Sequence, residues 1–439
     1  MARTQAEQQV AELLRTAKKA LGLSTTFLSR FDGTTQVLQV VESSVPLLFP
    51  EGSERPRSST FCQAILDGRL PEVIPDVRKH RVAMALPAAR FPRLRSYLSV
   101  PVRLSDGTIY GTLGAAGLTT DKNLSARDKA LMEVLAAAAA AVLEPGVVEA
   151  ARRSAIESRL RPVLDGRGPT VVMQPIVDLA TGRRAGAEAL SRFPVEWGRA
   201  PDSVFEEAHS VGLGDALELI ALENAVSHLD VDGYVALNVS PRTLLSPECG
   251  ELLARLPAGR ILLEISEHEK VEDYEALAAA LAAPRAAGMG LAIDDVGAGY
   301  ASLRHIMRTA PDLIKLDRGI VAGVSDDPVR RTLVSSLVGF AHESGAGVVA
   351  EGIETPADAA ACRALGVDLG QGWYYGRPGP PSGLAPIVTD PVRDRAGARR
   401  SADPIVQGRA QGRAVVDEAS VETRRIAVVP LSAVGSQGT

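Results

Sequence analysis

The sequence predicts an α/β fold, an eight-stranded (α/β)8 barrel preceded by a smaller α+β domain. Between residues 168 and 388, short apolar runs alternate with helical patterns, which is typical of the strands and helices of a barrel. Before residue 147, strand patterns are bracketed by two helical patterns, which is typical of an α+β domain. The chain has 439 residues, which leaves room for two or three domains at roughly 150 residues each.

The first domain is predicted over residues 1–147. Its opening helix places apolar residues at near-helical spacing from Val10 to Leu21. Alternating strand patterns follow, and Asp106-Gly107 marks a hairpin turn between the last two of them. An Ala-rich helix from about Ala126 to Leu143 closes the domain. We expect a homodimer that forms through these terminal helices.

The rest of the chain is predicted to form three segments. Pro145-Gly146 ends the first domain, and the charged helical pattern behind it predicts a helical linker over residues 148–167. The barrel is predicted over residues 168–388. The tail, residues 389–439, is rich in Arg, Gly and Ala without periodicity, so we expect it to be disordered.

The composition excludes several classes of function. The formal net charge is −5, so no basic surface indicates binding to a nucleic-acid polymer. The three cysteines lie far apart in the sequence, which favours a reducing cytoplasm and argues against a structural zinc site. The N-terminus resembles no signal peptide. The most apolar stretch contains Glu133 and is Ala-rich, so we expect a packed helix and no membrane contact.

A polar residue stands at or near the C-terminal end of each apolar run of the predicted barrel. A single Glu or Asn after a strand is most often a helix cap or a turn residue. Eight in succession need another explanation, because the C-terminal ends of barrel strands converge on the face where active sites are built. These residues are Gln174, Glu188, Asn238, Glu264, Asp294-Asp295, Lys315, Glu351 and Gln371.

The carboxylates in this set predict a metal site. Five like charges could not all ionise in one small site without a cation between them. All-oxygen ligands indicate Mg²⁺ or Mn²⁺ rather than zinc, and none of the six histidines falls at these positions. The adjacent pair Asp294-Asp295 indicates two ions, since one carboxylate can bridge both while its neighbour binds the second.

Lys315 allows two interpretations. A lysine at the end of a barrel strand could form a Schiff base, but such lysines are activated by desolvation or by cationic neighbours. Lys315 would instead lie among carboxylates and metal ions, which keeps it charged and suits it to orienting a water molecule. We favour the second interpretation and keep the first open.

These motifs resemble the EAL domain family of cyclic-di-GMP phosphodiesterases. The matches occur in order along the segment: "MQPI", "EALSRF", "LNVS", "LEISE", "DDVGAGYASL", "IKLD", "AEGIET" and "QGWYYGRP". The resemblance implies a TIM-like barrel with one early strand reversed and with two bound Mg²⁺ or Mn²⁺ ions. It also implies hydrolysis of cyclic di-GMP to linear pGpG.

The resemblance assigns roles residue by residue. The positions that match the ligands of the first metal are Glu188, Asn238, Glu264 and Asp294, and those around the second are Asp294, Asp295 and Glu351. The catalytic positions are Lys315, which matches the lysine that contacts the nucleophilic water, Glu351, and Glu267, which matches the glutamate that holds the loop "DDVGAGYASL". The substrate-contacting positions are Gln174, Leu190, Arg192 and Gln371. Arg192 has the planar fork that suits a phosphate.

The front segment resembles a GAF domain, a small-molecule sensor fold, through "TFCQAILDGRLPEVIPD" and "YLSVPVRLSDGTIYGTLGAAG". The resemblance implies a small-molecule ligand of unidentified nature. Cys62 could attach or ligate a cofactor, but a buried structural cysteine is the favoured interpretation.

The leading hypothesis is therefore a regulated cytoplasmic enzyme, a two-metal cyclic-guanylate-specific phosphodiesterase controlled by its front domain. The first alternative is a cyclic di-GMP receptor that turns over weakly or not at all, which a missing metal ligand would favour. The second is a Schiff-base lyase, which predicts borohydride trapping at Lys315 and indifference to chelators.

Overall fold

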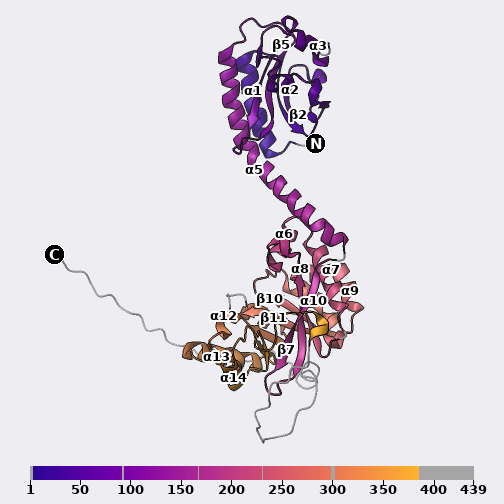
Figure 1. Ribbon diagram of the computed structural model, residues 1–439, viewed down its shortest axis with the longest axis vertical. Coiled ribbons are helices and arrows are strands. Elements are labelled where there is room, and N and C mark those ends of the chain that lie inside the picture. The colour runs from indigo at the N-terminus through magenta and orange to yellow at the C-terminus, as the bar shows by residue number, and fades with distance from the viewer. Residues whose placement is uncertain (1–2, 91–92, 167, 230, 298–301, 385–439) are drawn as a thin grey trace, which may run out of the picture. The chain divides into compact units, whose positions relative to one another are not determined.

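The computed structural model describes residues 3–90, 93–166, 168–229, 231–297 and 302–384. The chain divides into two compact units, Met1–Arg159 and Leu160–Thr439, which are coloured from indigo to yellow along the chain in Figure 1. The predicted tail, residues 389–439, lies outside the described residues. The domain boundaries predicted at residues 147, 167 and 388 stay a prediction.

The first unit contains a six-stranded antiparallel sheet in the order β3-β2-β1-β6-β5-β4. Its strands are β1 Thr25–Asp32, β2 Thr35–Ser43, β3 Glu54–Pro56, β4 Val73–Ile74, β5 Ser96–Arg103 and β6 Ile109–Gly117. The hairpin predicted at Asp106-Gly107 joins β5 to β6, and Gly107 takes the positive φ of 85° that such a turn requires. The α+β fold predicted for this part of the chain is confirmed.

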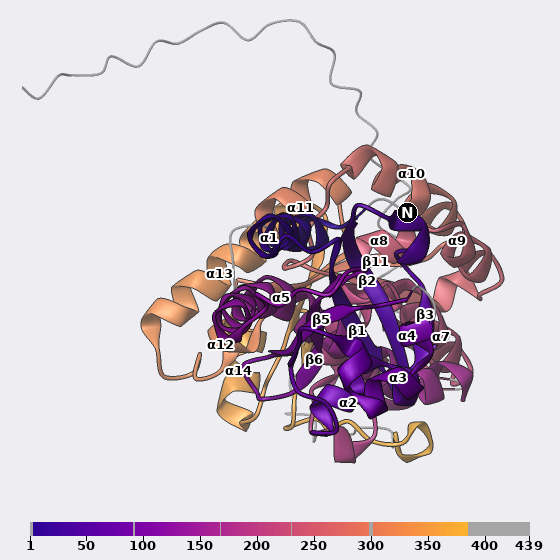
Figure 2. The same cartoon turned by 90° about the horizontal axis from the view of Figure 1, so that it is seen from above.

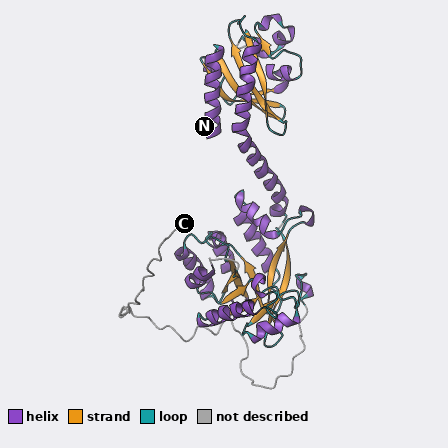
Figure 3. Cartoon of the chain, turned by 90° about the vertical axis from the view of Figure 1, so that its left-hand side faces the viewer, coloured by secondary structure: helices purple, strands orange, loops and turns teal. Residues whose placement is uncertain are grey.

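Helices cover both faces of this sheet. On one face lie α1 Gln5–Leu21 and the first part of α5 Ala126–Asp165 (Figures 1 and 3). Thr4 and Glu7 form a capping box that satisfies the first turn of α1. The other face packs against three shorter helices, α2 Phe61–Leu66, α3 Arg81–Ala85 and α4 Pro87–Arg90.

Helix α5 corrects one expectation. The sequence predicts a helix that ends near Leu143 and a break at Pro145-Gly146, whereas the helix continues unbroken to Asp165. A proline inside a helix removes one N–H donor, here the partner of the Ala141 carbonyl. Ala141, Pro145 and Gly146 are all exposed, so water can hydrogen-bond to that carbonyl and the helix persists.

Length and composition set α5 apart from the other described helices. It is the one helix among the described residues that is long and apolar enough to cross a membrane, and a single such helix is weak evidence of a span. Its buried side chains, which include Met132, Ala136 and Ala139, pack against the sheet of the first unit. The expected absence of membrane contact stays a prediction.

The second unit is a closed barrel of eight strands in the order β10-β11-β12-β13-β14-β7-β8-β9. The strands are β7 Thr170–Asp178, β8 Arg184–Arg192, β9 Tyr234–Asn238, β10 Ile261–Ser266, β11 Gly290–Val296, β12 Leu313–Leu316, β13 Gly347–Ala350 and β14 Leu369–Gln371. All neighbours pair in parallel except β7, which is antiparallel to both β14 and β8. The predicted barrel with one early strand reversed is confirmed.

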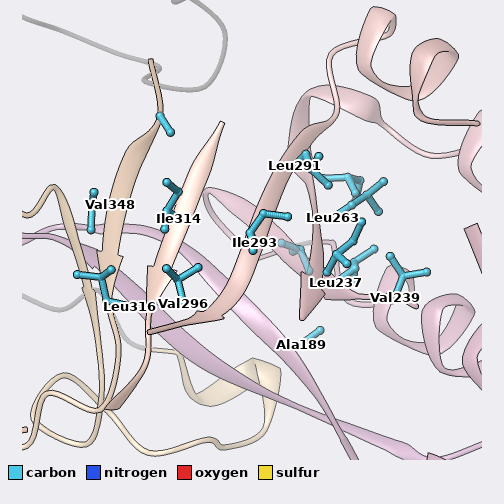
Figure 4. Packing of buried hydrophobic residues seen from close by; sticks show 14 of the residues in the cluster. Ala189, Leu237, Val239, Leu263, Leu291, Ile293, Val296, Ile314, Leu316 and Val348 are labelled. Atoms are coloured by element: carbon cyan, nitrogen blue, oxygen red, sulfur yellow. The ribbon is translucent and has the colours of Figure 1, made fainter. Parts of the chain in front are cut away.

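Helices pack against the outside of the barrel strands, and those labelled in Figure 2 include α9, α10, α11 and α13. They are α6 Pro201–Ser210, α7 Gly214–Val226, α8 Pro241–Leu244, α9 Pro247–Ala254, α10 Tyr274–Ala286, α11 Ser302–Thr309, α12 Arg318–Val321, α13 Pro328–Glu343 and α14 Pro356–Ala364. Alternate residues of each strand face outward and form the main apolar core with these helices, as Leu237, Leu263, Ile293 and Leu316 do (Figure 4). Burial of each such side chain contributes roughly 1.5–3 kcal/mol relative to exposure.

The inward-facing residues form a second, smaller apolar cluster. Its members are Ile176, Tyr234, Ala236, Leu262, Ala292, Leu313, Val349 and Leu369. This inner cluster fills the barrel interior below the C-terminal ends of the parallel strands. The inward-facing positions that follow it along those strands are therefore the first that can carry polar groups.

Candidate active site

The polar residues predicted from the strand ends follow the inner apolar cluster by two positions. The successive inward pairs are Gly186/Glu188, Ala236/Asn238, Leu262/Glu264, Ala292/Asp294, Leu313/Lys315, Val349/Glu351 and Leu369/Gln371. Because a strand returns to the same face every second residue, each polar side chain projects into the barrel at its C-terminal end. The structure therefore brings these predicted residues together.

Lys315 lies at the centre of this group. Its side chain is fully buried, with 0% exposure, and its Nζ lies 2.8 Å from Glu264 Oε2 and 2.8 Å from Glu351 Oε1. The same nitrogen is 3.0 Å from Asp294 Oδ2 and 3.6 Å from Glu188 Oε2. Burial alone would lower the pKa of Lys315, but the four carboxylates raise it well above its ordinary value. The ammonium therefore keeps its proton.

Glu188 is held by two polar neighbours besides the charge of Lys315. Asn238 Nδ2 donates to its Oε1 over 2.7 Å, and Gln371 Nε2 donates to its Oε2 over 2.6 Å. Gln371 in turn donates to Gln174 over 3.1 Å. Burial would raise the pKa of Glu188, yet Lys315 and the two amide donors hold it below its ordinary value. Glu188 is thus an ionised, oriented carboxylate.

The carboxylates of Glu264, Asp294 and Glu351 have too little positive charge around them to be fully ionised. Burial raises the pKa of Glu264 well above its ordinary range and also raises that of Asp294. Burial raises the pKa of Glu351 to about 8. One ammonium group cannot compensate four buried carboxylates, so the described site favours the entry of further cations.

Asp295 shows a backbone strain that is common at functional sites. It has a positive φ of 60°, which is rare outside glycine, and its N–H donates to Asp294 Oδ1 over 2.8 Å. Ser266 donates to Asp295 Oδ2 over 3.2 Å. The strained backbone turns two successive carboxylates toward the same region.

Two groups of three carboxylates could each hold a metal ion. The groups are Glu188, Glu264 and Asp294, and Asp294, Asp295 and Glu351, and the ligand atoms of each group lie within 4.8 Å of one another. Asp294 belongs to both groups. Oε1 of Glu264 is buried without a hydrogen-bond partner among the described residues. The all-oxygen donors and this partnerless atom fit hard divalent cations such as Mg²⁺ or Mn²⁺.

The comparison with known families agrees with this geometry. The EAL domain family matches residues 157–378, just over half of the chain, and the GAF domain family matches residues 4–144. The chain belongs to the EAL family. The EAL match contains every strand of the barrel and every residue of the acidic site.

Three relatives illustrate the similarity of the EAL barrel. An uncharacterized protein of Mycobacterium tuberculosis is 31% identical over 249 residues, which are 51% of this chain and 80% of that protein. A probable cyclic di-GMP phosphodiesterase of Escherichia coli is 30% identical over 233 residues, 50% of this chain and 44% of that protein. The PaMucR phosphodiesterase, solved as a c-di-GMP complex, is 28% identical with a TM-score of 0.47 and covers 52% of this chain and 99% of that one.

The predicted substrate-contacting residues of the EAL barrel lie on the strands next to the acidic group. Leu190 and Arg192 are on the same face of β8 as Glu188, two and four residues further along. Among the described residues, Arg192 donates to the Ser191 carbonyl over 2.8 Å and to no carboxylate. Its guanidinium therefore remains available to an anionic ligand.

Gln174 lies at the EAL site as predicted, but it does not stand at the end of a strand. The sequence places it near the C-terminal end of an apolar run, but it lies in the middle of β7, directly opposite Glu188. Because β7 runs against its neighbours, its C-terminal end lies at the other mouth of the barrel. Strand pairing, rather than the end of the strand, brings Gln174 to the site.

Glu267 is buried next to the acidic group, with 1% exposure. Its backbone N–H donates to the Asp294 carbonyl over 3.0 Å, so it is positioned beside the strand that carries two candidate ligands. The predicted anchoring of the loop "DDVGAGYASL" depends in part on residues 298–301, which lie outside the described residues.

Sequence reasoning missed two residues of the EAL site. Ser266 is hydrogen-bonded to Asp295, and His268 Nδ1 lies 3.8 Å from Asp295 Oδ2. His268 is therefore a neighbour of one candidate ligand, although it stands at none of the strand-end positions. No spacing pattern marks either residue. Ser266 is the last residue of β10, and His268 follows that strand in a segment whose path depends on tertiary contacts.

Proposed function

We propose that this chain hydrolyses cyclic di-GMP to linear pGpG with two divalent cations, Mg²⁺ or Mn²⁺. The observation that carries the proposal is the fully buried Lys315 ammonium, with four carboxylates within 3.6 Å of it, three on other strands and one, Glu351, directly after β13. The similarity to a probable cyclic di-GMP phosphodiesterase supports the substrate.

Two sets of residues would each hold one cation. Glu188, Asn238, Glu264 and Asp294 would hold one ion, while Asp294, Asp295 and Glu351 would hold the other. The cations, when bound, would supply the positive charge that stabilises an in-line displacement at phosphorus.

The remaining residues orient the reactants. Lys315 keeps its proton, so it can donate a hydrogen bond to the attacking water and hold it in line. For the same reason Lys315 is unsuited to Schiff-base chemistry, which needs a neutral amine. Arg192 offers a planar pair of donors to a phosphate, and the linked amides of Gln174 and Gln371 line the substrate side of Glu188.

Chelation tests the proposal. We expect the full-length protein to convert cyclic di-GMP to pGpG with Mg²⁺ or Mn²⁺, and EDTA to stop conversion because the carboxylates then lack compensating charge. Product is followed by chromatography. Added Mg²⁺ in excess of EDTA is the control and should restore the rate. Binding of cyclic di-GMP without any pGpG under these conditions would favour a receptor instead.

Arg192→Lys should weaken the binding of cyclic di-GMP by about tenfold, because a point charge cannot reproduce the planar fork. Equilibrium binding in Ca²⁺, which supports binding more readily than in-line chemistry, provides the measurement. Arg183→Lys, on the exposed turn between β7 and β8, is the matched control. Equal affinity of Arg192→Lys and wild type would remove Arg192 from the substrate site.

We also propose that the GAF domain regulates the EAL barrel and that the chain works as a homodimer. The support is the continuous helix α5, which contains the end of one unit and the start of the other. A chain that begins at residue 148 should therefore hydrolyse cyclic di-GMP at a different rate from the full-length protein. Side-by-side turnover at matched barrel concentration decides this, and equal rates would show that the front domain exerts no control.

A further inference from the structure

The backbone that follows β9 is held by a buried carboxylate of α7. Asn238 is the last residue of β9, and the N–H of Val239 behind it donates to the Glu264 carbonyl of the next strand over 3.0 Å. The N–H of Ser240 leaves that strand pairing and donates to Glu218 Oε2, also over 3.0 Å. Glu218 therefore fixes the chain directly behind a candidate metal ligand.

Glu218 is held in turn by His209 of α6. The other carboxylate oxygen of Glu218, Oε1, lies 2.6 Å from His209 Nε2, and Glu218 is 8% exposed. The imidazole ring lies against Gly214, where a Cβ atom would overlap it. The ring and the carboxylate therefore have little room to rotate.

His209 and Glu218 form an ion pair. Burial would raise the pKa of Glu218, but the hydrogen bonds with His209 and the Ser240 N–H hold it below its ordinary value. The hydrogen bond with Glu218 is in turn the main cause that raises the pKa of His209. The Ser240 N–H therefore faces a charged carboxylate, which is a stronger acceptor than a neutral group.

Asn238 depends on its backbone for its position. The residue is exposed, so packing of its side chain contributes little. Its Nδ2 donates to Glu188 Oε1 over 2.7 Å, which leaves Oδ1 as the side-chain atom that can bind a cation. Loss of a group that orients a metal ligand typically lowers metal affinity or activity by about 10–100-fold.

We propose that Glu218, held by His209, is a positioning residue that keeps Asn238 at its cation site through the Ser240 N–H. The role is indirect, because Glu218 belongs to neither group of candidate ligands. The inference rests on the proposed function, since it concerns a ligand of the same site. Its main readout, the binding of Mn²⁺, requires no turnover.

Glu218→Met tests the inference in the full-length protein, because methionine fills a similar volume and is only a weak acceptor. Mn²⁺ binding without substrate is followed by the electron paramagnetic resonance signal of the free ion, and folding by thermal unfolding. We expect the affinity for one Mn²⁺ ion to fall at least about tenfold. Glu218→Gln keeps an acceptor and should stay within about threefold of wild type. Glu223→Met, at an exposed position of α7, is the control and should bind Mn²⁺ as wild type does.

A double-mutant cycle with Asn238→Ala separates positioning from general support of the fold. If Glu218 acts through Asn238, Glu218→Met should weaken Mn²⁺ binding by less than about threefold once the Asn238 side chain has been removed. Two full and independent losses in the double variant would show that Glu218 acts elsewhere.

Ser240→Pro tests the same hydrogen bond from the donor side, even where Glu218→Met does not fold. It removes the N–H that Glu218 accepts, and the φ of −73° at Ser240 is one that proline adopts. Ser240→Ala is the matched control, because it loses the hydroxyl that caps α8 but keeps the N–H. Ser240→Pro should bind Mn²⁺ at least about tenfold more weakly than Ser240→Ala.

The outcomes distinguish this inference from the proposed function. Wild-type Mn²⁺ affinity in folded Glu218→Met, or equal affinities of Ser240→Pro and Ser240→Ala, would overturn the inference and leave the hydrolysis of cyclic di-GMP untouched. A wild-type protein that binds Mn²⁺ without forming pGpG would overturn the proposed function, while the binding measurements still decide the role of Glu218. A wild-type protein that binds no Mn²⁺ would overturn both.

Discussion

Glu188→Gln should reduce the turnover of cyclic di-GMP by at least about a hundredfold, which corresponds to about 2.7 kcal/mol of barrier. Glutamine has nearly the same shape but no charge. The pKa of Glu188 stays below its ordinary value, whereas burial raises the pKa of Glu264, Asp294 and Glu351, so Glu188 ionises more readily than those three. Its loss removes one member of the group formed with Glu264 and Asp294.

The measurements for this variant are the initial rate of pGpG formation across a Mn²⁺ titration and the melting temperature. Glu196→Gln is the matched control, since it makes the same chemical change at an exposed position near β8. We expect Glu188→Gln to melt near the wild-type temperature, because removing one of several crowded carboxylates relieves their repulsion. A wild-type rate in a correctly folded Glu188→Gln protein would contradict the two-ion site.

Lys315→Met should have two large effects. Methionine fills a similar volume but leaves four buried carboxylates without their common positive partner, and breaking such a buried ion pair costs about 3–5 kcal/mol of folding stability. Turnover should also fall at least about a hundredfold, through kcat rather than KM, because the lysine is proposed to orient the attacking water.

The loss of folding stability in Lys315→Met is measured by thermal unfolding, once with EDTA and once with Mn²⁺. Cations that bind the folded state should recover part of the lost stability, whereas the rate should stay low. Lys270→Met, at an exposed position after β10, is the control. A Lys315→Met protein with unchanged kcat and a raised KM would move the lysine from water orientation to substrate binding.

The sequence was sufficient for the fold because its strongest signals are periodic. Eight apolar runs separated by helical patterns correspond to the eight strands of the closed barrel. The break expected at Pro145 does not occur. The sequence could not show this, because local propensity does not tell whether the carbonyl that loses its N–H partner is exposed to water. In α5 the carbonyl of Ala141 is at an exposed position, and the helix continues.

A site residue was predictable from the sequence where the alternation of inward and outward residues along its own strand determines its position. Glu264 and Lys315 each stand two positions beyond an inward apolar residue, which is a signal within the sequence. Gln174 and His268 are placed by pairing and by loop path instead. The partner of a strand and the course of a loop depend on residues far away in the chain, so no local pattern can give them.

The reversed direction of β7 has a consequence for the connection from α5. Thr170, the first residue of β7, pairs with Arg192 at the C-terminal end of β8, so the strand starts at the mouth that holds the acidic group. Only residues 166–169 separate that start from the end of α5 at Asp165. Had β7 run parallel to its neighbours, α5 would enter the barrel at the opposite mouth. As it is, the connection from α5 joins the barrel at the rim that carries Arg192, on the side of the acidic group.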